Sequence, residues 1–74
     1  MALSEENILI IKGKAREAGD FLVKNNVTDL PAQNPYSYIW SMVNQHLGRN
    51  YKDCEDDDLD YILEIIEEYK NDAL

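Results

Sequence analysis

The most restrictive feature of the sequence is the stretch from Asp53 to Tyr69, where a run of acids leads into a regular apolar pattern. Apolar residues recur there at steps of three and four, which places them on one side of a helix with 3.6 residues per turn. No Gly or Pro interrupts residues 51–74. The pattern therefore predicts a helix over about residues 55–71. Its apolar stripe consists of Leu59, Ile62, Leu63, Ile66 and Tyr69.

Carboxylates precede this helix and continue along it. Asp53, Asp56 or Asp57 can cap the free N–H groups of its first turn, and negative charge there meets the positive end of the helix dipole. Asp60, Glu64, Glu67 and Asn71 fall opposite the apolar stripe. The helix is therefore expected to present a strongly acidic outer face.

Two earlier segments show the same periodicity with their own start and stop signals. Ser4 is a favourable N-cap and precedes a helical seam that ends near Lys24. Asn34 followed by Pro35 is a second start signal, and Gly48 suits the left-handed position after a helix end. These signals predict helices over about residues 5–24 and 35–47.

Three amphipathic helices with short connections predict an all-α fold, a small three-helix bundle that forms a single domain over residues 1–74. A hydrophobic fraction of 45% argues against a disordered chain. The core is expected to gather the three apolar stripes. These contain Ile8, Ile11, Ala15, Leu22, Ile39, Trp40, Val43, Leu47, Leu59, Ile62, Leu63 and Ile66.

Two apolar pairs fall outside the stripes. Tyr61 and Ile65 lie on the far side of the third helix, and Tyr38 and Met42 fall off the stripe of the second. The members of each pair are four residues apart and thus adjacent on the helix surface. They are either ordinary exposed apolar residues or contact patches for a partner or a second subunit.

The charge is concentrated in the last third of the chain. Through Asn50, five basic residues balance five acidic ones; from Tyr51 on, two basic residues against ten acidic ones give −8, the formal net charge of the whole chain. Binding to a nucleic-acid backbone needs clustered positive charge, so direct nucleic-acid binding is not expected. A basic protein surface is the better electrostatic match.

No residue set points to catalysis, a cofactor or a metal. The acid run has Asp58 where a calcium-binding EF-hand loop needs Gly, and the sequence lacks the soft ligands of a zinc site. Cys54 lies between two acids, which oppose formation of a thiolate nucleophile. His46, in the last turn of the second helix, favourably meets the negative end of the helix dipole. We therefore expect a protein that is not an enzyme.

The chain is expected to be cytoplasmic and to make no membrane contact. It contains no apolar run long enough to cross a bilayer and no signal-peptide pattern. One cysteine cannot form an internal disulfide, which agrees with a reducing compartment.

These features favour a non-catalytic protein-interaction module whose acidic third helix docks on a basic protein surface. One form of this hypothesis is a phage or mobile-element inhibitor whose carboxylates mimic nucleic-acid phosphates. The residues expected to bind the partner are Tyr38, Met42, Asp56, Asp57, Asp60, Tyr61, Glu64, Ile65 and Glu68.

Two alternatives remain. The apolar pairs would also suit a homodimer of structural or regulatory role. A helix-turn-helix-like transcriptional regulator would have to contact DNA with acids turned away, or through the basic residues of the first helix. Those basic residues are Lys12, Lys14, Arg16 and Lys24.

Overall fold

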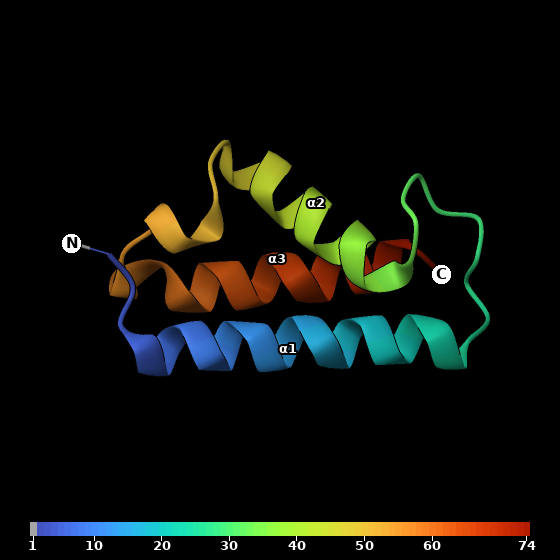
Figure 1. Ribbon diagram of the computed structural model, residues 1–74, viewed down its shortest axis with the longest axis horizontal. Coiled ribbons are helices and arrows are strands. Elements are labelled where there is room, and N and C mark those ends of the chain that lie inside the picture. Colours follow the sequence, from blue (N-terminus) through green and yellow to red (C-terminus); the bar gives the residue numbers. More distant parts are fainter. Residues whose placement is uncertain (1) are drawn as a thin grey trace.

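The computed structural model describes residues 2–74 and consists of three helices. Helix α1 (Glu5–Lys24) is followed by α2 (Pro35–Leu47), by the short 3₁₀ turns η1 (Tyr51–Asp53) and η2 (Asp56–Asp58), and by α3 (Leu59–Asp72). Helices α1 and α3 run in the same direction, while α2 returns obliquely across them (Figure 1). Each helix contacts the other two. The predicted three-helix bundle is confirmed.

The first two helices begin and end where their local signals predict. The Ser4 hydroxyl accepts a hydrogen bond from the backbone N–H of Asn7 at 3.3 Å. The Asn34 side-chain oxygen accepts one from the backbone N–H of Ser37 at 2.8 Å. Gly48 closes α2 with a φ of 71°, in the left-handed region that glycine adopts without strain. These contacts satisfy backbone groups that a bare helix end leaves unpaired.

The third helix begins later than expected, because residues 56–58 form the 3₁₀ turn η2 before α3 starts at Leu59. Within this turn the backbone N–H of Glu55 donates to the Asp58 carboxylate at 3.1 Å. Asp56 does not cap α3. One of its carboxylate oxygens instead accepts hydrogen bonds from the backbone N–H of Ser4, at 2.8 Å, and from the side-chain amide of Asn7, at 2.9 Å. The acid run therefore ties the start of α3 to the start of α1.

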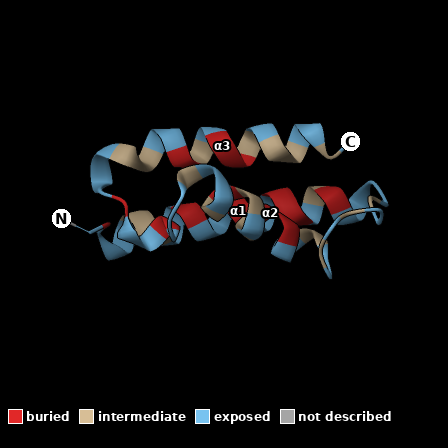
Figure 2. Cartoon of the chain, turned by 90° about the horizontal axis from the view of Figure 1, so that it is seen from above, coloured by how far each residue is buried: buried red, intermediate tan, exposed pale blue. Residues whose placement is uncertain are grey.

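The core is broader than the three predicted stripes. Ile65 is only 1% exposed and Tyr38 only 9% exposed, and Met42 packs partly buried against the core. The expectation that these residues lie on the surface is therefore wrong. Both α2 and α3 pack against two neighbours, so each buries a wider arc than a single stripe (Figure 2). The buried hydrophobic residues are Leu3, Ile11, Ala15, Ala18, Leu22, Tyr38, Ile39, Val43, Tyr51, Cys54, Ile62, Ile65 and Ile66.

Several residues expected inside lie at the edge of this core. They are partly buried and pack against it rather than within it. Each helix buries a wider arc of its surface than the predicted stripe, and the middle of that arc falls on other residues. The residues concerned are Ile8, Trp40, Leu47, Leu59 and Leu63.

Gly19 permits a close approach between α1 and the Tyr36 ring of α2. A Cβ atom added there would lie 2.2 Å from Cδ1 of the Tyr36 ring, far inside van der Waals contact. Gly13, earlier in the same helix, has open space where its Cβ would be. The two glycines of α1 thus have different structural roles.

We therefore expect opposite outcomes from the same substitution at these two sites. Gly13→Ala should raise the free energy of unfolding by about 0.5–1 kcal/mol, because alanine favours a helix interior. Gly19→Ala should lower it by about 1–3 kcal/mol, because the new methyl group overpacks the Tyr36 ring. Urea unfolding measures both. In a Tyr36→Ala background Gly19→Ala should become stabilising; a persistent loss there would contradict the close approach assigned to Gly19.

Candidate functional site

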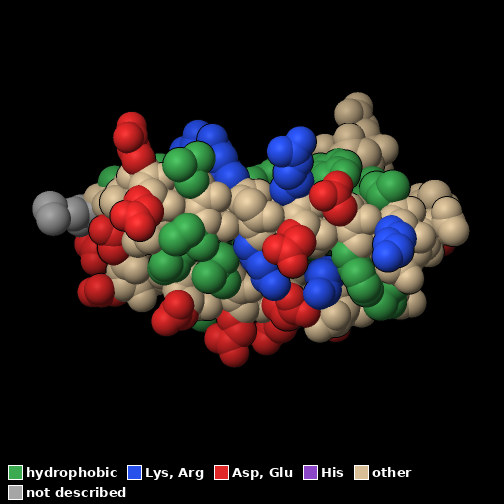
Figure 3. All heavy atoms as spheres, turned by 90° about the horizontal axis from the view of Figure 1, so that it is seen from below, with side chains coloured by type: hydrophobic (Ala, Val, Ile, Leu, Met, Phe, Trp, Pro, Cys, Tyr) green, Lys and Arg blue, Asp and Glu red, His purple; other side chains and the backbone are tan. Residues whose placement is uncertain are grey.

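Four carboxylates form a continuous row along the outer side of α3, which we call the acidic ridge: Asp60, Glu64, Glu68 and Asp72. All four are exposed. Each lies four residues from the next, an axial rise of about 6 Å per step. Within residues 2–74 none of them makes a salt bridge or a side-chain hydrogen bond. Figure 3 shows acidic side chains crowding the lower edge of the molecule, on the α3 side.

The acidic ridge opposes the stability of the helix that carries it. Like charges four residues apart on a helix are destabilising by about 0.2–0.5 kcal/mol per pair. Glu68 and Asp72 also lie near the C-terminal end of α3, where the helix dipole disfavours negative charge. The row is therefore electrostatically unfavourable in the free protein and would be relieved by a positively charged surface.

Among the predicted partner-binding residues, only some lie on or beside this ridge. Asp60, Glu64 and Glu68 form it, and Tyr61 beside them is 49% exposed. Asp57 is exposed just before α3. Asp56 is exposed but is bonded to the start of α1, and these hydrogen bonds, that from the backbone of Ser4 first, lower its pKa. Tyr38 and Ile65 are inside the core, so the structure leaves Tyr61 as the accessible apolar anchor.

Tyr61 is held in place by His46, which the sequence indicated only as a favourable helix-end residue. One ring nitrogen of His46, Nε2, lies 3.2 Å from the Tyr61 hydroxyl, and the other, Nδ1, lies 3.2 Å from the Tyr69 hydroxyl. A neutral imidazole can donate to one phenol and accept from the other. His46 thus links the end of α2 to two turns of α3 and fixes the Tyr61 ring beside the acidic ridge.

Glu67 is expected from the sequence on the outer face of the third helix, but it is paired internally because it lies at the edge that faces α1. It lies 2.6 Å from the Lys14 ammonium on α1 and 2.7 Å from that of Lys70, one turn along α3. Hydrogen bonds from Lys14 and then Lys70 lower the pKa of Glu67 from 4.5 to about 2. The chain therefore neutralises the α3 carboxylate that faces α1 and leaves the outer row unpaired.

This pair predicts a specific dependence of stability on pH. A folded-state pKa below the unfolded one stabilises the fold above about pH 4.5, and this contribution is lost as the pH falls toward 2. Because the Glu67 side chain is 39% exposed, solvent screens the pair. Lys14→Gln should cost less than about 1 kcal/mol at pH 7. Most of that difference should vanish near pH 2 in urea unfolding. An equal loss at both pH values, or the same profile for the exposed control Lys12→Gln, would contradict the assignment.

Cys54 is buried and unsuited to nucleophilic chemistry. Burial first, and then the nearby Asp58 carboxylate, raises the pKa of its thiol, so the reactive thiolate is disfavoured. Both nitrogens of the single histidine face tyrosine hydroxyls. Over the described residues no three His, Cys, Asp or Glu side chains are grouped so that they could hold a metal ion.

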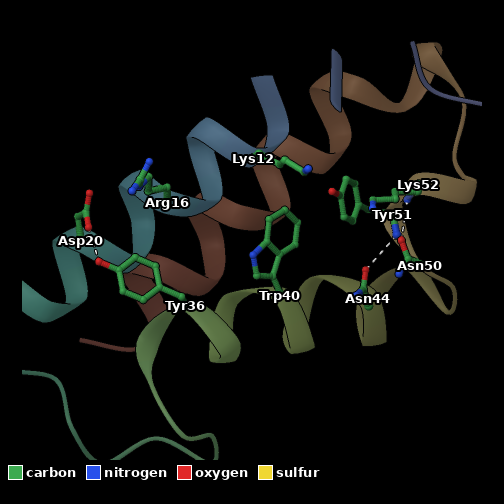
Figure 4. Close-up of a pocket in the computed structure, with 9 residues that line it drawn as sticks. All are labelled: Lys12, Arg16, Asp20, Tyr36, Trp40, Asn44, Asn50, Tyr51 and Lys52. Carbon is green, nitrogen blue, oxygen red and sulfur yellow. Dashed lines mark hydrogen bonds between the residues drawn. The ribbon is translucent and has the colours of Figure 1, made fainter. Parts of the chain in front are cut away.

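A second surface feature lies between α1 and α2: an open groove of about 1070 Å³ whose walls carry basic and aromatic side chains (Figure 4). Sequence reasoning missed it because the walls come from three separate elements. Its basic side chains set it apart from the acidic ridge. It is lined by Lys12, Arg16 and Asp20 of α1, Tyr36, Trp40 and Asn44 of α2, and Asn50, Tyr51 and Lys52.

No protein-family model, curated protein or solved structure matches this chain. Of the helices in residues 2–74, none is both long enough and apolar enough to cross a lipid bilayer. The case for a function therefore rests on the two surfaces described above.

Proposed function

We propose that this chain is a non-catalytic protein-interaction module whose acidic ridge docks on a basic surface of another protein. The observation that carries the proposal is the row of four exposed carboxylates, spaced about 6 Å apart and without an internal cationic partner. Complementary charge of this kind accelerates association and fixes the orientation of the partners.

The internal ion pairs of Glu67 support this proposal. Lys14 and Lys70 both pair with Glu67 and with none of the ridge carboxylates. An acidic face that served only to keep the protein soluble would gain stability from internal pairing or from wider spacing. A row that stays unpaired and destabilising is better explained by a partner that supplies the positive charge.

Tyr61 supplies the apolar contact that such an interface needs. It is half exposed, its hydroxyl is hydrogen-bonded to His46, and it lies next to Asp60 at the start of the ridge. A preoriented aromatic ring within a charged rim is the arrangement that dominates the energetics of many interfaces. Burial of Tyr38 and Ile65 in the core removes two expected apolar contacts from this proposal and from the homodimer hypothesis alike. The homodimer hypothesis has less support because it rested on the apolar pairs alone, whereas the present proposal also rests on the acidic ridge.

In the more specific form of the proposal, the partner is a DNA- or RNA-handling protein of the cytoplasm and the ridge covers its nucleic-acid site. Regularly spaced carboxylates would then occupy the positions of phosphates. Small acidic inhibitors of phage or mobile-element origin are the class of protein that this form implies.

Neutralising part of the ridge should stabilise the free protein. Glu64→Gln together with Glu68→Gln removes three repulsive contacts at four-residue spacing, so the free energy of unfolding should rise by about 0.5–1.5 kcal/mol. Thermal unfolding at low ionic strength should show a higher midpoint, and added salt should shrink the gain. A lower midpoint would mean that these carboxylates stabilise the helix, and the ridge would then need no partner to relieve it.

The double variant Glu64→Gln with Glu68→Gln should also no longer bind the partner protein. The unmodified chain, the double variant and a control variant are each immobilised and used to capture proteins from a cell lysate. The control, Glu17→Gln with Asp29→Asn, changes the net charge by the same amount at positions outside α3. We expect captured proteins with basic surfaces that are released by salt and that the double variant alone fails to retain. Release by added duplex DNA supports the nucleic-acid mimic specifically. Equal capture by all three proteins would overturn the proposal.

A further inference from the structure

The groove between α1 and α2 is locally basic in a strongly acidic protein. Lys12 and Arg16 stand one turn apart on α1, and Lys52 reaches it from η1. Its single carboxylate, Asp20, accepts a hydrogen bond from the Tyr36 hydroxyl. Three cations against one anion therefore line a groove in a chain whose formal net charge is −8.

Aromatic rings form the opposite wall and are held in fixed positions. Trp40 stacks on Tyr51 with ring centroids 4.7 Å apart and an angle of 25° between the planes. The backbone N–H of Tyr51 donates to the Asn44 side chain at 3.0 Å. Tyr51 is only 5% exposed, whereas Trp40 is partly exposed and Tyr36 is 36% exposed, so part of each of the latter two rings remains accessible. Figure 4 shows Tyr36, Trp40 and Tyr51 along one wall, with Lys12 and Arg16 facing them from α1.

The acidic ridge does not cancel this local charge at physiological ionic strength. None of the four ridge carboxylates lines the groove, and exposed charges separated by more than the Debye length, about 8 Å in physiological salt, are largely screened from each other. Figure 3 shows basic side chains on the upper edge with a few acids among them, whereas most of the acids crowd the lower edge. A small anion in the groove would therefore meet mainly the three cations.

We propose that this groove binds a mononucleotide. The base would stack on the accessible rings of Trp40 and Tyr36, and the phosphates would pair with Lys12, Arg16 and Lys52. Stacking on aromatic side chains and charge-assisted hydrogen bonds to phosphate are the two interactions that such walls offer. The groove volume of about 1070 Å³ slightly exceeds the usual range for small-molecule sites, about 300–1,000 Å³, so a mononucleotide has room to bind.

Two other kinds of anion fit less well. An acidic peptide offers carboxylates to the cations but no large planar ring to the aromatic wall. A long nucleic-acid strand would extend beyond the groove and meet the repulsion of a chain with net charge −8. A nucleotide combines a flat ring with compact negative charge, and this pairing matches both walls.

Trp40 is the only tryptophan of the chain, so its fluorescence reports directly on the groove. ATP should quench it saturably, with a dissociation constant between micromolar and millimolar. Adenosine, which lacks the phosphates, and inorganic tripolyphosphate, which lacks the ring, should each bind at least about tenfold more weakly. Lys12→Gln with Arg16→Gln should also weaken ATP binding at least about tenfold. The control pair Lys24→Gln with Arg49→Gln, which lies outside the groove, should leave it unchanged.

The proposal is independent of the protein-binding role of α3. Glu64→Gln with Glu68→Gln should leave ATP affinity within about twofold, since these residues lie outside the groove. Lack of saturable quenching by ATP would overturn the proposal, as would tripolyphosphate binding as tightly as ATP. Tighter binding of a short single-stranded oligonucleotide would assign the groove to nucleic acid instead, and tighter binding of a short poly-glutamate peptide would assign it to an acidic protein segment. Circular dichroism confirms that each variant stays folded.

Discussion

The packing of α3 against both other helices is the constraint on which the rest of the structure depends. Ile62, Ile65 and Ile66 are each no more than 1% exposed, so this helix buries a wide arc between α1 and α2. In a chain of 74 residues such burial supplies a large share of the free energy of folding. It also fixes which carboxylates of α3 can reach other helices and which cannot.

The distribution of charge follows from this packing. Glu67 lies at the edge that faces α1 and is neutralised by Lys14 and Lys70. The ridge carboxylates lie on the outer side, where the described part of the fold places no cation within salt-bridge reach. The basic groove is lined instead by residues of α1, of α2 and of the segment that follows α2, and α2 runs obliquely across α1 (Figure 1). One packing arrangement thus separates a negative surface from a positive one, and each is available to a different class of ligand.

Local features of the fold could be predicted from the sequence, because their causes are local. Ser4, Asn34 and Gly48 act within one turn of their own helix ends, and the start of α1 and both bounds of α2 follow from them. The all-α class follows from periodicity in the same way. The start predicted for α3 is too early because Asp56, a good capping residue, bonds to Ser4 and Asn7, far away in the sequence. No local pattern reveals that competition.

The candidate sites could be predicted less completely for the same reason. A single apolar stripe in the sequence indicates a helix that packs on one neighbouring helix. It could not reveal that α2 and α3 each pack on two neighbours and so bury Tyr38 and Ile65 as well. Asp60, Glu64 and Glu68 could be identified because four-residue spacing is visible in the sequence. The link from His46 to Tyr61 and the groove around Trp40 depend on how α2 lies against its neighbours, which only the structure shows.

The central claim, that α3 is buried on two sides, is tested most directly by removing one methylene-sized group from Ile65. Ile65→Val should lower the free energy of unfolding by about 0.5–1.5 kcal/mol, the usual cost at a closely packed site. The same change at Ile10, which is 44% exposed on α1, should have little effect. Urea unfolding of both variants, with equal slopes, gives the comparison. Equal and negligible losses at the two positions would show that Ile65 lies on the surface and would contradict the burial of α3 on two sides.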